Sequence, residues 1–196
     1  MWSDPKDGPQ NGKAIAEDLH AVLVAAGEKT PFVLVGHSLG GPYIMTYTKY
    51  FGPDVAGLVF VDASHPDQNQ RFNSLGLSSG QKAVESRIKI GAVLNWTGGT
   101  RAVVAAYKKI PNQRDIDDQA VKAYASTSLG AMLKESEAVD QTLAEAGSFR
   151  HLGNRPVYVL TAMRPLPEET LAQLKLTPEQ GRQFQTIWKE MQDEEA

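Results

Sequence analysis

The feature that most constrains the fold is the stretch PFVLVGHSLGGPYIMTY, residues 31–47. A short, continuous apolar run leads into G-H-S-L-G-G, and a pattern typical of a helix follows. Such a run suits a strand that is covered on both faces, as in a parallel sheet. A serine between glycines, at the junction of a strand and a helix, indicates a nucleophile elbow, in which the serine sits on a sharp turn. The stretch therefore predicts an α/β fold with Ser38 as a nucleophile.

The pentapeptide G-x-S-x-G places glycines at positions 36 and 40 on either side of Ser38. With 17 glycines in the chain, the pentapeptide alone is weak evidence, and its position between a strand and a helix gives it weight. The glycines fit a strained turn at which strand and helix pass close together. The backbone N–H of Leu39, at the helix N-terminus, is then expected to face an oxyanion.

The alternation of elements along the chain supports the same fold class. We expect strands at 32–35, 57–61 and 156–161 and helices at 14–26 and 39–51. Helices that alternate with buried strands along the chain are typical of an α/β fold. Further helices are expected at 80–91, 99–109 and 116–146, and two in the tail, the second capped by Thr177 with Pro178 at its first position.

Size and composition exclude several classes of function. The 196 residues, 41% of them hydrophobic, suit one ordinary globular domain. A net charge of −3 with scattered basic residues argues against nucleic acid or a membrane surface as a partner. There is no cysteine, no secretory leader and no apolar run of ~18 residues, so the default expectation is a soluble, cytoplasmic protein, unless an upstream segment has been lost. No ligand spacing near the elbow suggests a metal, and no cofactor is expected.

The segments LVGHSLGG and VAGLVFVDASHPDQ resemble the α/β-hydrolase superfamily, and most closely its esterase-like branch. The residues WSDP near the start are also similar to a segment of that family. The resemblance covers roughly residues 2–70 and, weakly, 156–161. It implies a partial α/β-hydrolase fold with a short parallel sheet of about three strands, flanked by helices. The core would comprise residues 1–66 and 151–196, and a helical cap would comprise residues 67–150.

Asp62 is the candidate acid because it closes the strand after the elbow. The carboxyl ends of parallel strands meet at one edge of the sheet, so Asp62 is expected beside Ser38. In the family that the chain resembles, the acid usually follows the next strand, where this chain has no carboxylate before Glu168 and Glu169. A minority of the family uses the position of Asp62. Either glutamate, or a purely structural Asp62 that caps the next turn, remains an alternative.

A serine nucleophile needs a base within hydrogen-bond reach, and histidine is the usual one. The chain has four histidines, His20, His37, His65 and His151. His20 is off the apolar face of its helix and is expected to be a solvated surface residue. The resemblance gives His37 a role in supporting the turn, and His151 precedes a strand and so lies at its amino end. His65 is at the correct edge and is the candidate base, with capping or packing as the alternative.

The resemblance also shows what the chain lacks. The family has an eight-stranded sheet with the elbow after its fifth strand, and its catalytic histidine follows the last strand, whereas this chain has no histidine beyond His151. If the three expected strands are the fifth to seventh, the earlier strands and a second oxyanion donor are missing. Losing one such donor typically costs ~10²–10³ in rate. The bare edge of the elbow strand would invite another chain, so a homo-oligomer is expected.

Three functions remain open from the sequence. The first is a serine hydrolase that cleaves small carboxylic esters through an acyl-enzyme on Ser38, with Asp62 and His65 as acid and base. The second is an impaired or truncated hydrolase that acts as a binding or self-associating module. The third is another acyl-handling chemistry, such as an acyltransferase or a haloperoxidase-like activity. Aromatic residues of the expected cap could line an acyl pocket or form the cap's own core: Phe72, Trp96, Tyr107 and Tyr124.

Overall fold

The computed structural model describes residues 7–73, 128, 130–174 and 176–196. The chain divides into two compact units. One comprises Asn11–Gly80 and Val139–Ala196, and the other comprises Met1–Gln10 and Gln81–Ala138. All three described strands, and with them Ser38, belong to the first unit.

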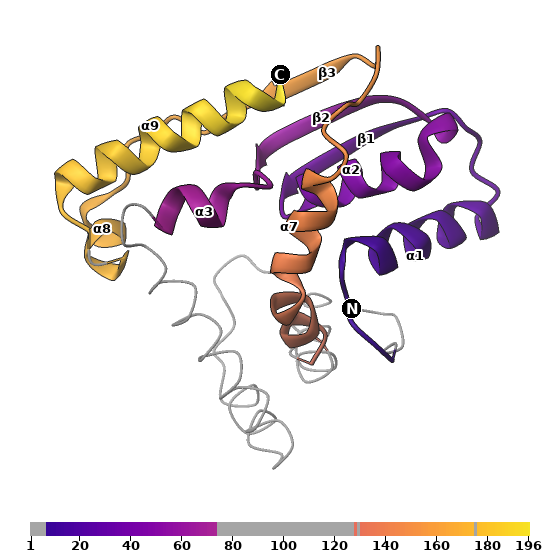
Figure 1. Ribbon diagram of the computed structural model, residues 1–196, viewed down its shortest axis with the longest axis horizontal. Helices are drawn as coiled ribbons and strands as arrows, with labels where there is room; N and C mark the ends of the chain where they lie inside the picture. Colours follow the sequence, from indigo (N-terminus) through magenta and orange to yellow (C-terminus); the bar gives the residue numbers. More distant parts are fainter. Residues whose placement is uncertain (1–6, 74–127, 129, 175) are drawn as a thin grey trace, which may run out of the picture. The chain divides into compact units, whose positions relative to one another are not determined.

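The α-helices and strands of the first unit are labelled in Figure 1. In chain order they are α1 (Gly12–Ala25), β1 (Phe32–Ser38), α2 (Gly40–Phe51), a short 3₁₀ helix η1 (Gly52–Asp54), β2 (Val55–Ala63), α3 (Gln68–Asn73), α7 (Val139–Gly147), β3 (Val157–Leu160), α8 (Glu168–Leu174) and α9 (Pro178–Glu195). None of the helices in the described part of the chain is long and apolar enough to cross a membrane.

The three strands form one parallel sheet in the order β1-β2-β3. Leu58 of the central strand is in register with Leu34 of β1 and with Val157 of β3. Parallel neighbours need a crossover connection, and α2 supplies it between β1 and β2. This arrangement confirms the predicted α/β class with a short parallel sheet flanked by helices.

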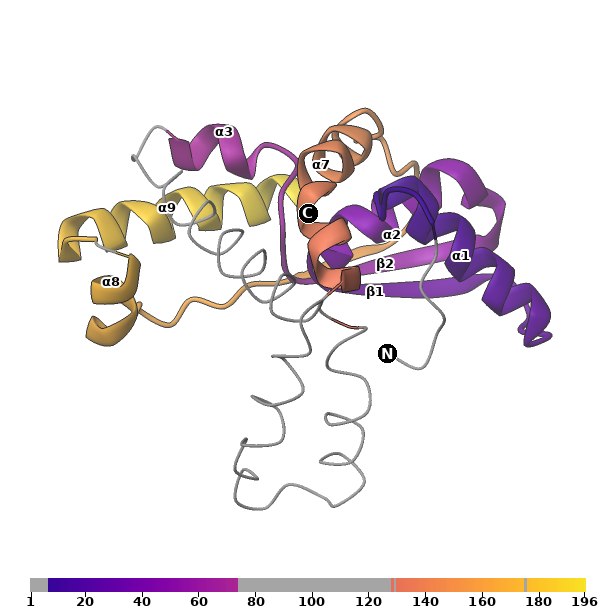
Figure 2. The ribbon, with the colours of Figure 1, turned by 90° about the horizontal axis from the view of Figure 1, so that it is seen from below.

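Helix α2 covers one face of the sheet, and α1 and α7 pack against α2. Figures 1 and 2 show α1 and α2 on the same side of the strands. In this core, Leu58 and Tyr47 are fully buried, and Ala16 of α1 is nearly so. The hydroxyl of Thr142 in α7 accepts a hydrogen bond of 2.9 Å from the backbone N–H of Gly12, which ties α7 to the start of α1.

The last helix begins at the predicted residue. The side chain of Thr177 accepts a hydrogen bond from the backbone N–H of Gln180, and the side chain of Gln180 accepts one from the backbone N–H of Thr177. This capping box satisfies two backbone donors that a helix N-terminus leaves without partners. Pro178 occupies the first turn, where its missing N–H costs nothing. The sequence prediction for this helix start is therefore confirmed.

The predicted helical cap, residues 67–150, lies mostly outside the described residues. The predicted helices 80–91 and 99–109 lie entirely outside the described residues. Two helices inside the predicted cap range, α3 and α7, belong to the same compact unit as the sheet.

Candidate active site

Ser38 ends β1 with a backbone conformation that serine rarely adopts. Its φ is 53°, in the left-handed region, and α2 begins two residues later. A non-glycine residue in this region costs about 1–3 kcal/mol and persists only where the surrounding structure holds it. A strained strand-to-helix turn that exposes a serine is the geometry of a nucleophile elbow. Ser38 is an exposed residue.

Two glycines make this turn possible. A Cβ at Gly36 would lie 2.4 Å from the carbonyl oxygen of Gly40, and a Cβ at Gly41 would lie 2.6 Å from the Cβ of Ala63. Non-bonded atoms do not approach this closely. β1, α2 and β2 can therefore lie so near one another only because Gly36 and Gly41 have no side chain. A backbone hydrogen bond of 2.8 Å from the N–H of Ser64 to the carbonyl of Ser38 ties the elbow to the end of β2.

Leu39 lies between Ser38 and the first turn of α2, at the N-cap position of that helix. The N-terminus of α2 presents partial positive charge toward Ser38, since the peptide dipoles of its 12 residues are aligned. An oxyanion formed on a substrate beside Ser38 would be stabilised by this charge and by the Leu39 N–H. The role of Leu39 stays a prediction.

Asp62 lies at the carboxyl end of β2, as predicted, and joins three segments of the chain. Its Oδ1 accepts a hydrogen bond of 2.7 Å from Trp188 Nε1 of α9 and one of 3.1 Å from the backbone N–H of Ala162, just after β3. Asp62 also has a positive φ, 45°, so the end of β2 is a second strained point at this edge. In the described part of the chain both bonds go to Oδ1, which leaves Oδ2 able to accept another donor.

His65 is 3% exposed and is held by its own turn and by α9. Its Nδ1 accepts a hydrogen bond of 3.1 Å from the backbone N–H of Asp67, and its Nε2 lies 3.5 Å from Oε2 of Glu194. Burial lowers the pKa of His65 below its usual value, and the nearby carboxylates of Asp67 and Glu194 oppose this in part. The neutral ring therefore carries its proton on Nε2, toward Glu194.

The structure places the three predicted residues at one edge of the sheet but not in one hydrogen-bonded chain. Among the described residues, no hydrogen bond joins the Ser38 hydroxyl, the Asp62 carboxylate and the His65 ring. Asp62 contacts Trp188 and Ala162, whereas His65 contacts Asp67 and Glu194. The alternative acids, Glu168 and Glu169, are exposed in the first turn of α8.

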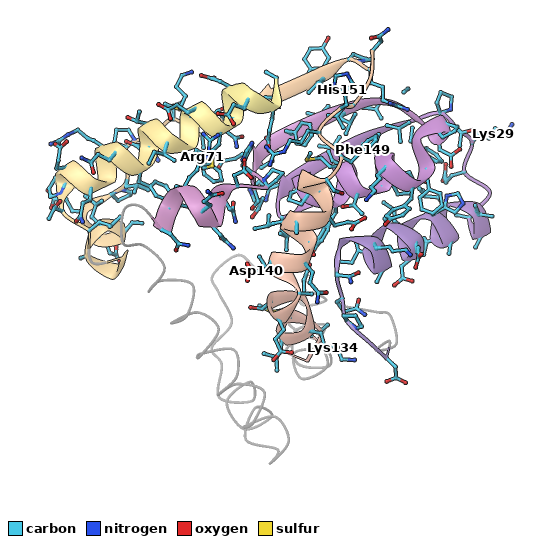
Figure 3. All side chains as sticks on the ribbon, in the orientation of Figure 1. Lys29, Arg71, Lys134, Asp140, Phe149 and His151 are labelled. Carbon is cyan, nitrogen blue, oxygen red and sulfur yellow. The ribbon has the colours of Figure 1, made fainter. Side chains whose placement is uncertain are left out.

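The other histidines do not approach Ser38 through any hydrogen bond of the described residues. His37 is exposed in β1, and His151, labelled in Figure 3, is exposed in the loop before β3. The expectation that His20 is a solvated surface residue is wrong. Its ring stacks on Phe51 at 3.9 Å between centroids, and its Nδ1 lies 3.4 Å from Oδ2 of Asp54. These partners are far from His20 in sequence, so helical periodicity alone could not reveal them.

Helix α9 holds the end of β2 through contacts that the sequence analysis missed. The side-chain amide of Gln192, fully buried, accepts a hydrogen bond of 3.2 Å from the backbone N–H of Ala63 and donates one of 2.7 Å to its carbonyl. Glu194, two residues on, accepts from Arg71 of α3, which lies beside α9 in Figure 3. Phe72 of α3 stacks on Phe184 of α9 at 4.6 Å between centroids.

Phe72 was expected either to line an acyl pocket or to lie in the core of the cap, whereas it packs against α9, a helix outside the predicted cap range. The other three aromatic residues considered with it lie outside the described part of the chain.

A small cavity of about 80 Å³ lies beside His65. Its lining consists of charged and polar side chains together with apolar ones: His65, Arg150, Glu194, Glu195, Met45, Phe60, Pro66 and Leu152. Both carboxylate oxygens of Glu195 are buried without a hydrogen-bond partner, and burial raises the pKa of Glu195 to about 8. Ser38 does not line this cavity. Within the described ranges, no group of three or more histidines and carboxylates could hold a metal ion.

The sequence as a whole matches a known family. A profile described as "Alpha/beta hydrolase family" matches residues 4–192. The chain belongs to the alpha/beta hydrolase family. Its sheet with the elbow serine at the end of β1 is a partial alpha/beta-hydrolase fold, and membership of the family supports a hydrolase function in general terms.

Two curated proteins match the chain over a shorter stretch of 62 residues. One, named as a probable transporter of Hormonema carpetanum, is 37% identical over 31% of this chain and 9% of its own length. The other, an uncharacterized protein of Schizosaccharomyces pombe, is 36% identical over 32% of this chain and 12% of its own length. The chain thus matches only about a tenth of each relative, and their names do not indicate a substrate. No solved structure matches the chain.

Replacing Trp188 by phenylalanine is expected to lower the free energy of unfolding by about 2 kcal/mol. The variant keeps an aromatic ring beside Phe184 but loses the N–H that donates to the charged Asp62, and such hydrogen bonds contribute about 1.5–3 kcal/mol. Urea denaturation measures the change. In an Asp62→Ala background, which has no side-chain acceptor for the indole N–H, the same replacement should cost clearly less, because coupled residues are not additive. An equal cost in both backgrounds would show that the hydrogen bond is not the cause.

Proposed function

We propose that the chain is a serine hydrolase that cleaves small carboxylic esters through an acyl-enzyme on Ser38. The observation that supports this most is the φ of 53° at Ser38, directly before the N-terminus of α2. A side chain at Gly36 would clash with the backbone of this turn, and one at Gly41 would clash with the side chain of Ala63. A structure that retains strain of this kind at an exposed serine is expected to use that serine.

In the proposed reaction, the Ser38 hydroxyl attacks the ester carbonyl while its proton passes to a base. The Leu39 N–H and the N-terminus of α2 stabilise the negative charge on the carbonyl oxygen. Collapse of the tetrahedral intermediate breaks the bond to the alcohol, which leaves with the proton from the base. Water then attacks the acyl-enzyme and gives up a proton to the same base. As the bond to the Ser38 oxygen breaks, the base returns that proton to Ser38 and the carboxylic acid is released.

We assign the acid to Asp62 and the base to His65. The two hydrogen bonds to Oδ1 of Asp62 fix its carboxylate and leave Oδ2 to accept a ring N–H. The lowered pKa of His65 keeps its ring neutral at pH 7, as a base must be. To reach Ser38, the His65 ring has to give up its contacts with Asp67 and Glu194, so slow turnover is expected.

The second candidate is a catalytically impaired hydrolase that acts as a binding or self-associating module. The arrangement of His65 favours it, because both ring nitrogens already face partners other than Ser38 and Asp62. In this case Ser38 would keep its strained turn without an efficient base.

Labelling with a fluorophosphonate, followed by peptide mass spectrometry, tests the proposal. The label is expected on Ser38 and should be absent in Ser38→Ala. His65→Gln should slow both labelling and hydrolysis of p-nitrophenyl acetate, whereas His151→Gln, which changes an exposed histidine at the other end of β3, should not. A wild-type protein that takes no label at Ser38 would overturn the proposed esterase. Labelling without turnover would favour the second candidate.

A further inference from the structure

Among the described residues, one face of the sheet is uncovered and largely apolar. On the face that α2 covers, Leu34, Leu58 and Phe60 are buried. On the other face, large apolar side chains of both outer strands are mostly exposed: Val33 at 62%, Val35 at 64%, Tyr158 at 68% and Leu160 at 58%. Both outer strands therefore present apolar side chains to solvent at alternate positions, which is the spacing of one sheet face.

Strand register joins these residues into a continuous surface, which we call the open face. Val35 is in register with Val59, and Val59 with Tyr158. In the next row, Val61 of β2 is in register with Leu160 and with His37 of β1, an exposed polar residue at the margin of the surface. Val59 and Val61 are half-buried, so the surface continues across the central strand. No Asp, Glu, Lys or Arg stands at these positions.

Parallel sheets normally have both faces covered, because exposing a continuous row of Val, Leu and aromatic side chains to water is unfavourable. A contiguous exposed apolar patch on a soluble protein marks an interaction site. Depletion of charge and the presence of a tyrosine are typical of the buried centre of a protein interface.

We propose that the open face is a homodimer interface, at which a second copy of this chain packs its own open face. The exposed parts of the four outer side chains amount to roughly 500 Å² per copy, taking about 100–250 Å² for each whole side chain. Two copies would thus bury roughly 1,000 Å², which just reaches the minimum for a specific interface. The dimer is therefore weak and dependent on concentration.

The absence of charge explains why the second copy packs face to face. An uncharged surface is complementary to itself, and a two-fold axis brings the same patch together from both copies. β1 is also an edge strand among the described residues, since it pairs only with β2. Pairing of two β1 edges would extend the sheet and leave the open face in water, so it would not bury these side chains. The proposal does not depend on the activity of Ser38, which lies at the end of β1.

Sedimentation of the full chain from low to high micromolar concentration tests the dimer. The wild type should show a reversible monomer–dimer equilibrium. Val35→Lys and Tyr158→Lys should each weaken it at least ~10-fold, because each would bury a charge without a partner. Val22→Lys is the matched control, since Val22 is 64% exposed on α1, on the other side of the sheet, and should dimerise as the wild type does.

Val35→Thr serves as a milder second variant, because threonine keeps the shape and the strand propensity of valine. It should weaken the dimer by a smaller factor, and a melting curve for each variant shows that it is folded. A wild type that stays monomeric at all concentrations overturns the proposal and leaves the open face to a different occupant. A dimer that withstands both Tyr158→Lys and Val35→Thr, or that Val22→Lys weakens equally, overturns it as well.

Discussion

Replacing Gly36 by alanine is expected to lower the free energy of unfolding by about 3 kcal/mol or more. The new Cβ would lie 2.4 Å from the carbonyl oxygen and 2.5 Å from the carbonyl carbon of Gly40. These are backbone atoms, which cannot swing away as the end of a side chain can. The start of α2 must therefore move away from β1, and overpacking of this severity is at the high end of its usual cost. The rate of fluorophosphonate labelling at Ser38 should also decrease in this variant, because the strained turn opens.

Gly40→Ala is the control for this replacement. It lies in the same motif, yet a Cβ there meets nothing within 4 Å, and alanine favours the first turn of α2 better than glycine does. Its free energy of unfolding, measured in urea, should be equal to that of the wild type or higher by up to about 1 kcal/mol. If both variants lost the same stability, the close approach of strand and helix would not be the reason for Gly36.

The second large effect concerns pH and Glu195. Burial raises the pKa of its carboxyl to about 8 in the folded chain, against an ordinary value of 4.5. Between pH 4.5 and about pH 8, the Glu195 carboxyl is protonated in the folded state and ionised in the unfolded state. The stability that this group contributes is therefore complete below pH 4.5 and is lost as the pH rises through 8. A shift of this size corresponds to at most about 5 kcal/mol.

Glu195→Gln should remove most of this pH dependence. The amide has nearly the same shape and no charge, so the variant should be more stable than the wild type at pH 8 and similar to it at pH 4.5. Glu190→Gln, an exposed position on the same helix, should leave the slope unchanged. Urea denaturation at several pH values measures all three proteins. A wild-type stability that does not fall between pH 5 and 8 would contradict a buried Glu195.

Local sequence was sufficient to predict the parts of the fold that depend on neighbours in the chain. The elbow, the three strands and the cap of α9 at Thr177 each rest on residues a few positions apart, and the structure has them all. The ends of the strands were less accurate. β2 runs from Val55 to Ala63 instead of 57–61, because pairing with β1 extends it.

The candidate site could be predicted only in part, since its contacts join distant residues. Asp62 and Trp188 are 126 positions apart, and no periodicity or motif links them. The same holds for His20, which stacks on Phe51 because α1 packs against α2. The edge of the sheet at which the candidates lie follows from strand direction, whereas the direction in which each side chain points depends on helix docking.

The hydrogen bonds between Gln192 and Ala63 have a consequence for how the chain can vary in length. They join residues 129 positions apart, and so they close a long loop at a fixed point beside the elbow. The entropy of closing a flexible loop grows slowly, by about 0.6 kcal/mol for each doubling of its length. Insertions or deletions in the connecting chain that leave its helices and β3 intact should therefore change stability little, provided that α9 still brings its amide to the end of β2. The serine turn would therefore tolerate such changes in the length of the chain that follows it.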